Sequence, residues 1–429
     1  MLQVAILKIL RLNSISTFTG GVETYIVNID RMLAELGHET MVITFNAGEK
    51  MPQSEMSVEI RTTKNPMYRF FHDLIPNEKI VNFLNEKFLE FAPDLIHIHH
   101  IRIGFSSLEK FLRLTNVPVV FTAHDALLVC PLSTLVKPGN EICNGGTGIR
   151  CGLTGCKIQG HLTYELLLAR TIERIQKRHI KAFLCPSYSI FNYLDNVGFA
   201  PVVHLPSFSN FPKSAVEKEP DYESILTYKS IGYIGRLEHY KGIQDLLAAF
   251  KIFSVDHPDY NLKIAGIGTF EEQLKSLASK LNLTDKVIWL GKLSGIQTED
   301  FYKSISTLVV PSNYWENFPL VAQEALLRGV PTIGTRIGGI PEIIQDGITG
   351  KIVSISSPDE IAVALAEIIS NPERTLEFMK NGRNFIMKAF TPEKHLKGLL
   401  NVYSNVINEQ KIPNRSEALD LVQNSLGET

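Results

Sequence analysis

The sequence predicts an α/β protein made of two similar domains, each built around a parallel β-sheet. The chain has 429 residues, 44% of them hydrophobic, which is enough for two or three domains that each bury a core. Short apolar runs alternate with longer amphipathic stretches in both halves, as expected when helices connect parallel strands. A charged, proline-punctuated stretch separates the halves. We therefore expect domains at residues 1–205 and 229–391, joined by a linker or hinge at 206–228.

The elements of the first domain follow from short apolar runs bounded by polar residues. Strands are expected at residues 4–10, 40–45, 95–98, 117–121 and 182–185. Between the first two, the stretch 22–36 has helical periodicity and follows the pair Gly20-Gly21. Glycines at the start of a helix let backbone N–H groups approach an anion. The pair is a weak signal alone and indicates an anion site only together with other motifs.

The second domain repeats this rhythm, and its first strand leads into a basic loop. Strands are expected at residues 230–234, 262–266, 287–290, 307–310 and 331–334. The first of them is followed by Arg236 and Lys241, and then by a helical stretch that begins at Ile243. Two cations between a strand end and a helix start favour a diphosphate, because charge, N–H donors and helix dipole act together. The alternative is that both cations are simply solvated, as loop Lys and Arg often are.

The segment from Glu316 to Glu324 places two carboxylates eight positions apart around the start of a short helix. Pro319 suits its first turn and a glycine follows its end, so we expect this helix at residues 319–328. Glu316 then precedes the helix, and Glu324 shares a face with apolar residues. Carboxylates placed in this way usually hold a polar group. The alternative for Glu324 is a surface pair with Arg328, which contributes only about 0.3–0.5 kcal/mol.

A third loop of the same kind contains Gly338 and Gly339, between the apolar run 330–334 and a strand at 351–353. All three loops follow strands in one alternating pattern of strands and helices. Right-handed crossovers place such loops along the carboxyl ends of a parallel sheet. Since ligands bind in the crevice at these ends, the three loops predict one ligand site.

Taken in order, five motifs closely resemble those of the retaining glycosyltransferases of family 4, also called glycosyltransferase group 1: Gly235-Arg236, Lys241-Gly242, Glu316-Asn317-Phe318-Pro319, Gln323-Glu324-Ala325 and Gly338-Gly339. The likeness extends to residues 20–23 and to His124-Asp125, so it covers nearly the whole chain. Each motif is weak alone, but five in order are specific. The resemblance implies the GT-B fold, two Rossmann-like domains facing each other across a cleft. It also implies that the last helix, expected at 392–410, crosses back to the first domain; residues 411–429 are expected to form a tail.

An activity is implied by the same resemblance. It is transfer of a sugar from a nucleoside diphosphate sugar to an acceptor hydroxyl, with retention of the anomeric configuration and no metal required. In the family pattern, the residue matching Glu316 contacts the sugar hydroxyls and the one matching Glu324 contacts the ribose hydroxyls. Arg236 and Lys241 would stabilise the departing diphosphate. His124 matches the family's histidine near the sugar, although a single histidine after a strand is often structural.

Two helix starts complete the donor site that the resemblance implies. Besides the two cations and Glu324, it comprises Gly21, Asn317, Phe318, Pro319 and Leu320, largely through backbone N–H groups. The expected acceptor is a glycan or a lipid-linked glycan, as in the biosynthesis of polysaccharides and lipid-linked antigens by relatives of this kind. The donor base, the sugar and the linkage are left open by the sequence.

Other functions fit the same residues less well. Two carboxylates could form the acid and nucleophile of a glycosidase, but that reaction leaves Arg236 and Lys241 without a role. Another GT-B enzyme, such as an epimerase or a phosphorylase, is disfavoured by the pair Glu316 and Glu324. From a different class, the chain could be a catalytically inactive scaffold that binds nucleotide sugars. The intact set of two cations and two carboxylates favours an enzyme.

The four cysteines Cys130, Cys143, Cys151 and Cys156 fall within 27 residues of a glycine-rich segment, whereas Cys185 ends an apolar run. Their spacing matches no standard two-knuckle zinc motif. Four close thiols in a reducing compartment nevertheless suit a structural Zn²⁺ better than disulfides. Free thiols or a redox-labile pair are the alternatives. Any zinc here would hold the loop and take no part in catalysis.

A net charge of −2 provides no global basic field, which argues against a nucleic-acid-binding protein. The N-terminal apolar stretch at residues 1–10 is too short, and too soon interrupted by Arg11 and Asn13, to form a signal peptide, and no run of 18 apolar residues occurs. We therefore expect a cytoplasmic protein. Residues 67–71 and 79–91 mix aromatic and basic side chains, which favours peripheral contact with the inner face of a membrane. The alternative for the second stretch is an amphipathic helix packed on its own domain.

Overall fold

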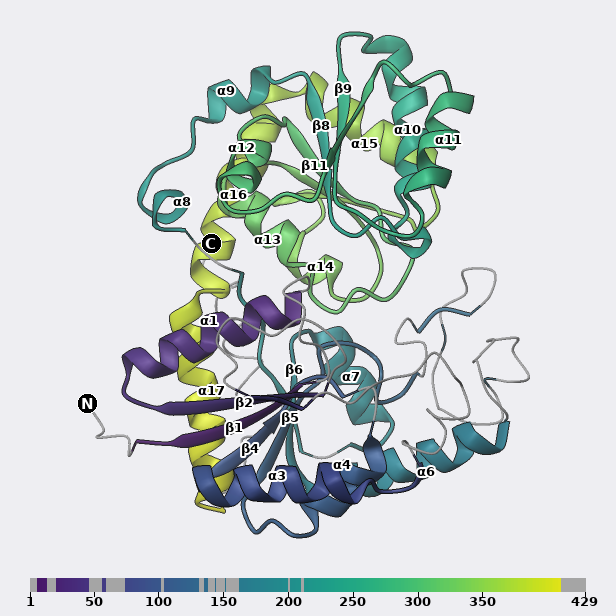
Figure 1. Cartoon of the computed structure of the whole chain (residues 1–429). Coiled ribbons are helices and arrows are strands. Elements are labelled where there is room, and N and C mark those ends of the chain that lie inside the picture. The colour runs from purple at the N-terminus through teal and green to yellow at the C-terminus, as the bar shows by residue number, and fades with distance from the viewer. Residues whose placement is uncertain are drawn as a thin grey trace. The chain divides into compact units, whose positions relative to one another are not determined.

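The computed structural model describes residues 6–13, 21–45, 56–58, 74–101, 104–130, 135–137, 143, 151, 162–199, 201–209 and 212–409. They belong to two compact units (Figure 1). Unit 1 is formed by Met1–Ser207 and Glu393–Thr429, and unit 2 by Phe208–Pro392.

Unit 1 contains a parallel sheet of seven strands in the order β3-β2-β1-β4-β5-β6-β7. The strands are β1 (Lys8–Asn13), β2 (Glu39–Phe45), β3 (Met56–Val58), β4 (Leu95–Ile98), β5 (Val119–Thr122), β6 (Ile180–Cys185) and β7 (Val202–His204). The helices are α1 (Gly21–Glu35), α3 (Glu78–Phe91), α4 (Phe105–Leu112), α6 (Leu162–His179), α7 (Tyr188–Asn196) and α17 (Pro392–Ile407). Helix α1 lies on one face of the sheet and α3 and α4 lie on the other (Figure 1). Central strands covered on both faces are buried along their whole length, as β4 and β5 are.

Unit 2 contains a parallel sheet of six strands in the order β10-β9-β8-β11-β12-β13. The strands are β8 (Ser230–Ile234), β9 (Asn261–Ala265), β10 (Val287–Gly291), β11 (Thr307–Val310), β12 (Thr332–Thr335) and β13 (Gly350–Val353). The helices are α8 (Lys213–Glu217), α9 (Tyr222–Thr227), the 3₁₀ helix η1 (His239–Lys241), α10 (Ile243–Asp256), α11 (Glu271–Lys280), α12 (Ile296–Tyr302), α13 (Leu320–Leu327), α14 (Ile340–Ile343), α15 (Pro358–Ser370) and α16 (Pro372–Ala389). Its core joins β8 and β9 to α10 and α15 through residues such as Ile231, Leu262, Phe250 and Leu365.

Both sheets have the strand order of a Rossmann fold, which confirms the predicted fold class. The first strand differs from its prediction, since β1 extends to Asn13 instead of ending at residue 10. Its polar residues Arg11 and Asn13 are fully buried. Apolar periodicity alone places such residues outside a strand, because their burial depends on partners elsewhere in the chain.

The boundary between the units falls after Ser207, near the start of the segment expected to be a linker. From Phe208 onward that segment belongs to unit 2, and it includes the helices α8 and α9. The buried guanidinium of Arg383 on α16 donates hydrogen bonds to the carbonyl oxygens of Ala215, Val216 and Lys218 at 2.7–3.0 Å. The helix expected at 392–410 is α17, and its residues from Glu393 onward belong to unit 1. The expected tail at 411–429 lies outside the described residues.

Candidate functional site

The order of each sheet reverses at one point, between β1 and β4 in unit 1 and between β8 and β11 in unit 2. In open α/β sheets, ligands bind at the carboxyl ends of the strands beside such a reversal. The predicted site residues of unit 2 follow β8, β11 and β12, which are neighbours in the sheet. The three loops therefore start side by side, as the sequence predicted.

Glycines let these loops approach one another closely. Gly242 is the N-cap residue of α10 and has a φ of +73°, and a Cβ there would lie 1.8 Å from the carbonyl oxygen of Pro311. Gly338, with φ of +58°, packs so tightly that a Cβ would lie 2.0 Å from the carbonyl oxygen of Glu316. Gly339 N–H donates a hydrogen bond of 2.7 Å to the same oxygen. Any side chain at positions 242 or 338 would therefore push the loops apart.

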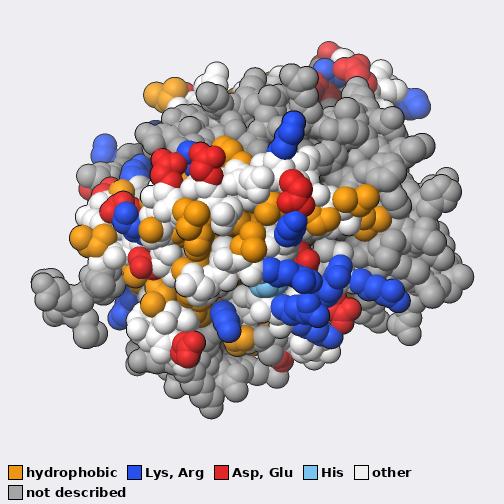
Figure 2. Space-filling model, turned by 60° about the horizontal axis from the view of Figure 1, so that its bottom comes forward, with side chains coloured by type: hydrophobic (Ala, Val, Ile, Leu, Met, Phe, Trp, Pro, Cys, Tyr) orange, Lys and Arg blue, Asp and Glu red, His pale blue; other side chains and the backbone are white. Residues whose placement is uncertain are grey.

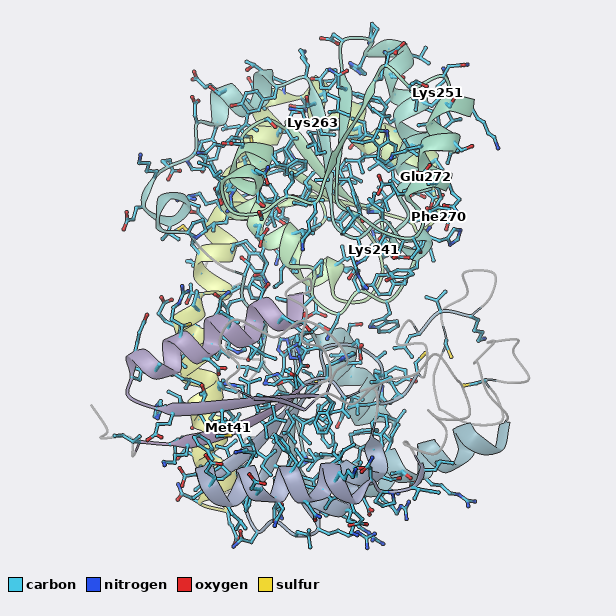
Figure 3. All side chains as sticks on the ribbon, in the orientation of Figure 1. Met41, Lys241, Lys251, Lys263, Phe270 and Glu272 are labelled. Atoms are coloured by element: carbon cyan, nitrogen blue, oxygen red, sulfur yellow. The ribbon has the colours of Figure 1, made fainter. Side chains whose placement is uncertain are left out.

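The carboxylate of Glu316 is 10% exposed and receives hydrogen bonds from three side chains. Lys241 Nζ lies 2.6 Å from Glu316 Oε1, Ser312 Oγ donates to the same oxygen at 2.7 Å, and Tyr314 OH donates to Oε2 at 2.7 Å. Lys241 also donates to Tyr314 OH at 3.0 Å. Figure 3 marks the position of Lys241 in the loop between β8 and α10. The structure thus joins two predicted site residues that are 75 positions apart.

These contacts set the ionisation of Glu316. Burial alone would raise the pKa of this carboxyl, but the Lys241 ammonium and the three hydrogen bonds outweigh burial and lower the pKa. Glu316 is therefore held as a carboxylate, an acceptor of hydrogen bonds. Ser312 and Tyr314 were not foreseen from the sequence, although both lie within four residues of Glu316.

Arg236 is exposed, as expected for a solvated cation. Lys241 is half-buried and paired with Glu316, so the solvated-cation alternative is wrong for Lys241. The Arg236 guanidinium lies 5.9 Å from the centre of the Tyr240 ring. The Tyr233 hydroxyl donates to the Arg236 carbonyl oxygen at 2.8 Å and so fixes the backbone of the loop. A cation with an exposed head on a fixed backbone is well placed to meet an anionic ligand.

Helix α13 begins at Leu320 and ends at Leu327, within one residue of the predicted bounds. Pro319 is its N-cap residue. Asn317, Phe318 and Leu320 are half-buried, and Phe318 packs edge-on against Phe390 with 5.2 Å between ring centres. The predicted donor-binding segment therefore forms the N-terminal end of a helix beside Glu316.

Glu324 lies on the half-buried face of α13, and its partner differs from the alternative considered above. The Tyr302 hydroxyl donates to Glu324 Oε2 at 2.9 Å. Arg328 forms its ion pair with Glu299 and donates only to the backbone oxygen of Glu324, at 2.7 Å. A surface pair between the Glu324 carboxylate and the Arg328 guanidinium is therefore the wrong interpretation. Burial raises the pKa of Glu324, and the nearby Arg328 charge opposes this effect only in part.

In unit 1, Gly21 is the first residue of α1, and Gly20 lies outside the described residues. His124 follows β5 and is half-buried, with its Nε2 3.0 Å from Nδ1 of His99. Its neighbour Asp125 lies 3.0 Å from His100 Nε2 and accepts a hydrogen bond from the backbone of Leu127. These residues lie at the carboxyl ends of β4 and β5, next to the reversal of the sheet order.

A buried polar cluster behind His124 was missed in the sequence. It consists of Arg11, Asp30, His97, His99, Tyr25, Tyr403 and His395. The alternating histidines of 97–99 at the end of a buried strand are the local signal that could have indicated it. The last two members come from α17, about 300 residues later, and leave no local signal.

Cys130, Cys143 and Cys151 are half-buried, while Cys156 lies outside the described residues. Among the residues that the structure describes, no group of three or more His, Cys, Asp or Glu side chains is arranged to hold a metal ion. The proposed four-cysteine set is not covered by this statement, since one of its members is not described. Cys185 is buried, and burial raises the pKa of its thiol, as expected for a core cysteine.

None of the helices in the described residues is long and apolar enough to cross a membrane. Helix α3, which spans the whole of the predicted membrane-contact stretch 79–91, buries its apolar side chains Ile80, Val81, Leu84 and Phe88 in unit 1. The other stretch, 67–71, lies outside the described residues. Helix α6 instead carries four exposed cations, Arg170, Arg174, Lys177 and Arg178. Lys and Arg side chains gather on one side of the face shown in Figure 2.

Comparison with known proteins accounts for both units. The family model for glycosyltransferase family 4 matches residues 19–207, and the model for glycosyl transferases group 1 matches residues 216–385. An uncharacterized glycosyltransferase of Methanocaldococcus jannaschii is 32% identical over 41% of this chain, and the match spans 44% of that relative's length. The N-acetyl-α-D-glucosaminyl L-malate synthase of Bacillus anthracis is 23% identical over 91% of this chain and 96% of its own length.

Solved structures share the fold over nearly the whole chain. The sucrose-phosphate synthase of Thermosynechococcus elongatus has a TM-score of 0.72 at 19% identity, covering 94% of this chain and all of that one. Anabaena HepE in complex with UDP-glucose has a TM-score of 0.67 at 16% identity, covering 93% and 100%. Two Rossmann-like units with these matches define a glycosyltransferase of the GT-B type. The chain belongs to the family 4 or group 1 glycosyltransferases, whose two family models together account for its two units.

Proposed function

We propose that this protein transfers a sugar from a nucleoside diphosphate sugar to a hydroxyl of a glycan or lipid-linked acceptor, with retention of configuration and without a catalytic metal. The observation that carries the proposal is the Lys241–Glu316 pair beside the reversal of the unit 2 sheet. An ammonium and a carboxylate held together by Ser312 and Tyr314 suit a ligand with both a diphosphate and a polyhydroxylated sugar.

The donor is assigned to unit 2. HepE, a structural relative of this chain, is described in complex with UDP-glucose, which supports a nucleotide sugar as the ligand class. In the proposed complex, Glu324 accepts hydrogen bonds from the ribose hydroxyls and Glu316 accepts them from the sugar. Arg236, Lys241 and the backbone N–H groups at the start of α13 contact the diphosphate.

Breaking the glycosyl–phosphate bond leaves negative charge on the diphosphate and positive charge on the sugar ring. Arg236 and Lys241 stabilise the leaving phosphate, which is the task that a metal ion performs in other transferases. We propose that the acceptor attacks from the same face as the departing phosphate, which takes the proton of the acceptor hydroxyl. The product then keeps the anomeric configuration of the donor, and NMR of the isolated product measures it. An inverted product would contradict the retaining mechanism but leave the transferase in place.

The acceptor belongs to polysaccharide or lipid-linked glycan biosynthesis in this proposal, and the protein works at a membrane surface. The exposed cations of α6 support such contact, because anionic headgroups attract Lys and Arg by about 1 kcal/mol each. Arg170, Arg174 and Arg178 are spaced by four positions and so lie along one face of the helix. The salt bridge from Lys177 to Glu173, at 2.6 Å, leaves the three arginines as the main candidates.

A thermal-shift panel with UDP, GDP, ADP and their common sugar conjugates tests the donor site. Ligand binding raises apparent stability by mass action, about 2.7 kcal/mol at 100 times Kd. We expect one nucleotide to raise the Tm of the wild type and to lose this effect in Glu324→Ala. Glu377→Ala, an exposed position on α16, is the control and should keep the shift. No shift with any nucleotide would refute the donor site, and binding of a nucleotide sugar without any turnover would favour an inactive scaffold.

A further inference from the structure

Arg11 occupies the centre of unit 1 with no access to water. Its Nε donates to Asp30 Oδ1 at 2.5 Å. Its Nη1 faces two imidazole nitrogens, His97 Nδ1 at 3.0 Å and His99 Nε2 at 2.8 Å. A guanidinium in a protein is always protonated and can only donate hydrogen bonds. Both imidazole nitrogens must therefore be acceptors, which fixes the tautomer of each ring.

The tautomer of His99 in turn determines the tautomer of His124, the predicted site histidine. With Nε2 as the acceptor, the ring hydrogen of a neutral His99 is on Nδ1. That nitrogen lies 3.0 Å from His124 Nε2, so His99 Nδ1 donates and His124 Nε2 accepts. The ring hydrogen of a neutral His124 is then on Nδ1. Free histidine in water prefers the other tautomer, so this arrangement is one that the protein imposes.

The same constraint, applied to His97, gives a consistent result. Its Nδ1 lies 3.0 Å from Arg11 Nη1, which can only donate, and 2.6 Å from the Tyr403 hydroxyl, which is able to donate to it. Its ring hydrogen is therefore on Nε2, which lies 2.7 Å from the hydroxyl of Thr122, a group able to accept it. With these hydrogen positions, every N–H group of His97 and His99 faces an acceptor, and no two N–H groups face each other.

Protonation of either ring would disrupt the series of hydrogen bonds from Arg11 through His99 to His124. A second hydrogen on His99 would face the Arg11 guanidinium, and one on His124 Nε2 would face the His99 N–H. The groups around the rings act in the same direction. Burial lowers the pKa of His99 far below its usual range, and burial together with the nearby His100 lowers the pKa of His124 to about 3. Both rings are neutral near pH 7.

We propose that Arg11 and His99 are positioning residues that set the tautomer of His124, so that its Nδ1 presents an N–H donor to the substrate. The inference rests on the proposed function insofar as it makes that substrate a sugar. His124 then recognises an oxygen acceptor, such as a hydroxyl oxygen of a sugar, and does not serve as the base that takes the proton of the acceptor hydroxyl. A neutral N–H donor also fits a site in which positive charge develops on the sugar ring, since it adds no further cation.

The test reads the tautomer directly from the full-length protein labelled with ¹⁵N-histidine. Long-range ¹H–¹⁵N correlation spectra distinguish a protonated from an unprotonated ring nitrogen, and the signals absent from His124→Gln assign that residue. We expect His124 to show a protonated Nδ1 and an unprotonated Nε2 near pH 7. A protonated Nε2 in the wild-type protein, in either the neutral or the charged ring, would overturn the proposal.

Two variants at position 99 add a rescue. His99→Phe keeps a ring but removes the donor, so His124 should change to the Nε2–H tautomer. His99→Asn places an amide N–H near the position of Nδ1 and should restore the Nδ1–H tautomer. His38→Asn, at a buried histidine whose Nδ1 accepts from the backbone of Leu7, is the control and should leave the His124 signals unchanged. An unchanged tautomer in His99→Phe would remove His99 from its proposed role.

Different measurements test this inference and the proposed function, so a failure of one can be distinguished from a failure of the other. The tautomer is measured in the ligand-free protein and depends only on contacts inside unit 1. The proposed function is tested by nucleotide binding to unit 2. A correct tautomer in a protein that binds no nucleotide would therefore refute the function alone.

Discussion

The ionisation of Glu316 makes the free energy of unfolding depend on pH. Its pKa is lower in the folded protein than in the unfolded chain, so the folded state binds fewer protons. The stabilisation by this carboxylate is therefore complete above the ordinary pKa of glutamate. It is lost as the pH falls through the lower pKa of the folded state. At neutral pH the Lys241 and Tyr314 contacts require the charged form.

We expect Glu316→Gln to destabilise the protein by roughly 1–3 kcal/mol at neutral pH, because the Lys241 ammonium loses its counter-charge in a poorly solvated place. The free energy of unfolding, measured with denaturant from about pH 7 to about pH 3, should show the difference from wild type shrinking as the pH falls. At low pH both proteins carry a neutral side chain at this position.

Glu373→Gln, at an exposed position in the first turn of α16, is the matched control and should change the free energy of unfolding at neutral pH by less than about 1 kcal/mol. A Glu316→Gln difference that stays constant with pH would show that the folded-state pKa of Glu316 is not lowered.

At the scale of the elements, the close approach of two loops depends on Gly338. A Cβ at this position would lie 2.0 Å from a backbone oxygen, and φ is +58°. Gly291 has a similar φ of +64°, but a Cβ added there would meet nothing within 4 Å among the described residues. The two positions therefore separate the backbone cost of a positive φ from the cost of the steric clash.

We expect Gly291→Ala to cost about 1 kcal/mol through its left-handed backbone alone. Gly338→Ala should cost at least about 2 kcal/mol more and should also weaken nucleotide binding, because the Glu316 backbone must move. Denaturant unfolding and the thermal-shift panel measure the two effects. Equal costs for both variants would contradict the tight packing of the loops.

The four-cysteine segment makes a prediction of a different kind. If Cys130, Cys143, Cys151 and Cys156 hold a structural Zn²⁺, the purified protein should contain about one zinc per chain, and a chelator should lower its Tm. Cys143→Ser should lower both the zinc content and the Tm. Metal analysis together with melting curves decides the matter. If the purified protein contains no metal and Cys143→Ser leaves its Tm unchanged, the zinc hypothesis is wrong. Cys185→Ser, in the core, is the reference for a purely structural cysteine.

The elements show which features could be predicted from sequence. Helix α13 was predicted to within one residue, because proline and glycine at its ends act locally. The three-residue strands β3 and β7 were missed, since such short edge strands carry no periodicity. The neighbouring loops of Lys241 and Glu316 followed from the strand order. The cluster of Arg11 could not be predicted, because Tyr403 and His395 reach it from α17, far along the chain.

At the scale of the whole molecule, the cations of α6 predict binding to anionic membranes. The full-length protein should sediment with vesicles that contain phosphatidylglycerol and remain in solution with phosphatidylcholine vesicles. Salt should reduce the binding, since exposed charges are screened. Replacing Arg170, Arg174 and Arg178 with Glu should abolish it.

Lys280→Glu, at the end of α11 in unit 2, is the control for a change of charge at an exposed cation and should still bind. Equal sedimentation of the triple variant and the wild type would remove α6 from the proposed membrane surface.

The placement of α17 has a consequence for the order in which the protein is made. His395 and Tyr403 bond to Tyr25 and His97, so the interior of unit 1 is completed by residues that leave the ribosome after the whole of unit 2. Unit 2 is synthesised in full while unit 1 still lacks this helix. Domains usually mature from the N-terminus onward during translation. Here the core of the first domain gains its last side chains only after the second domain has been synthesised in full.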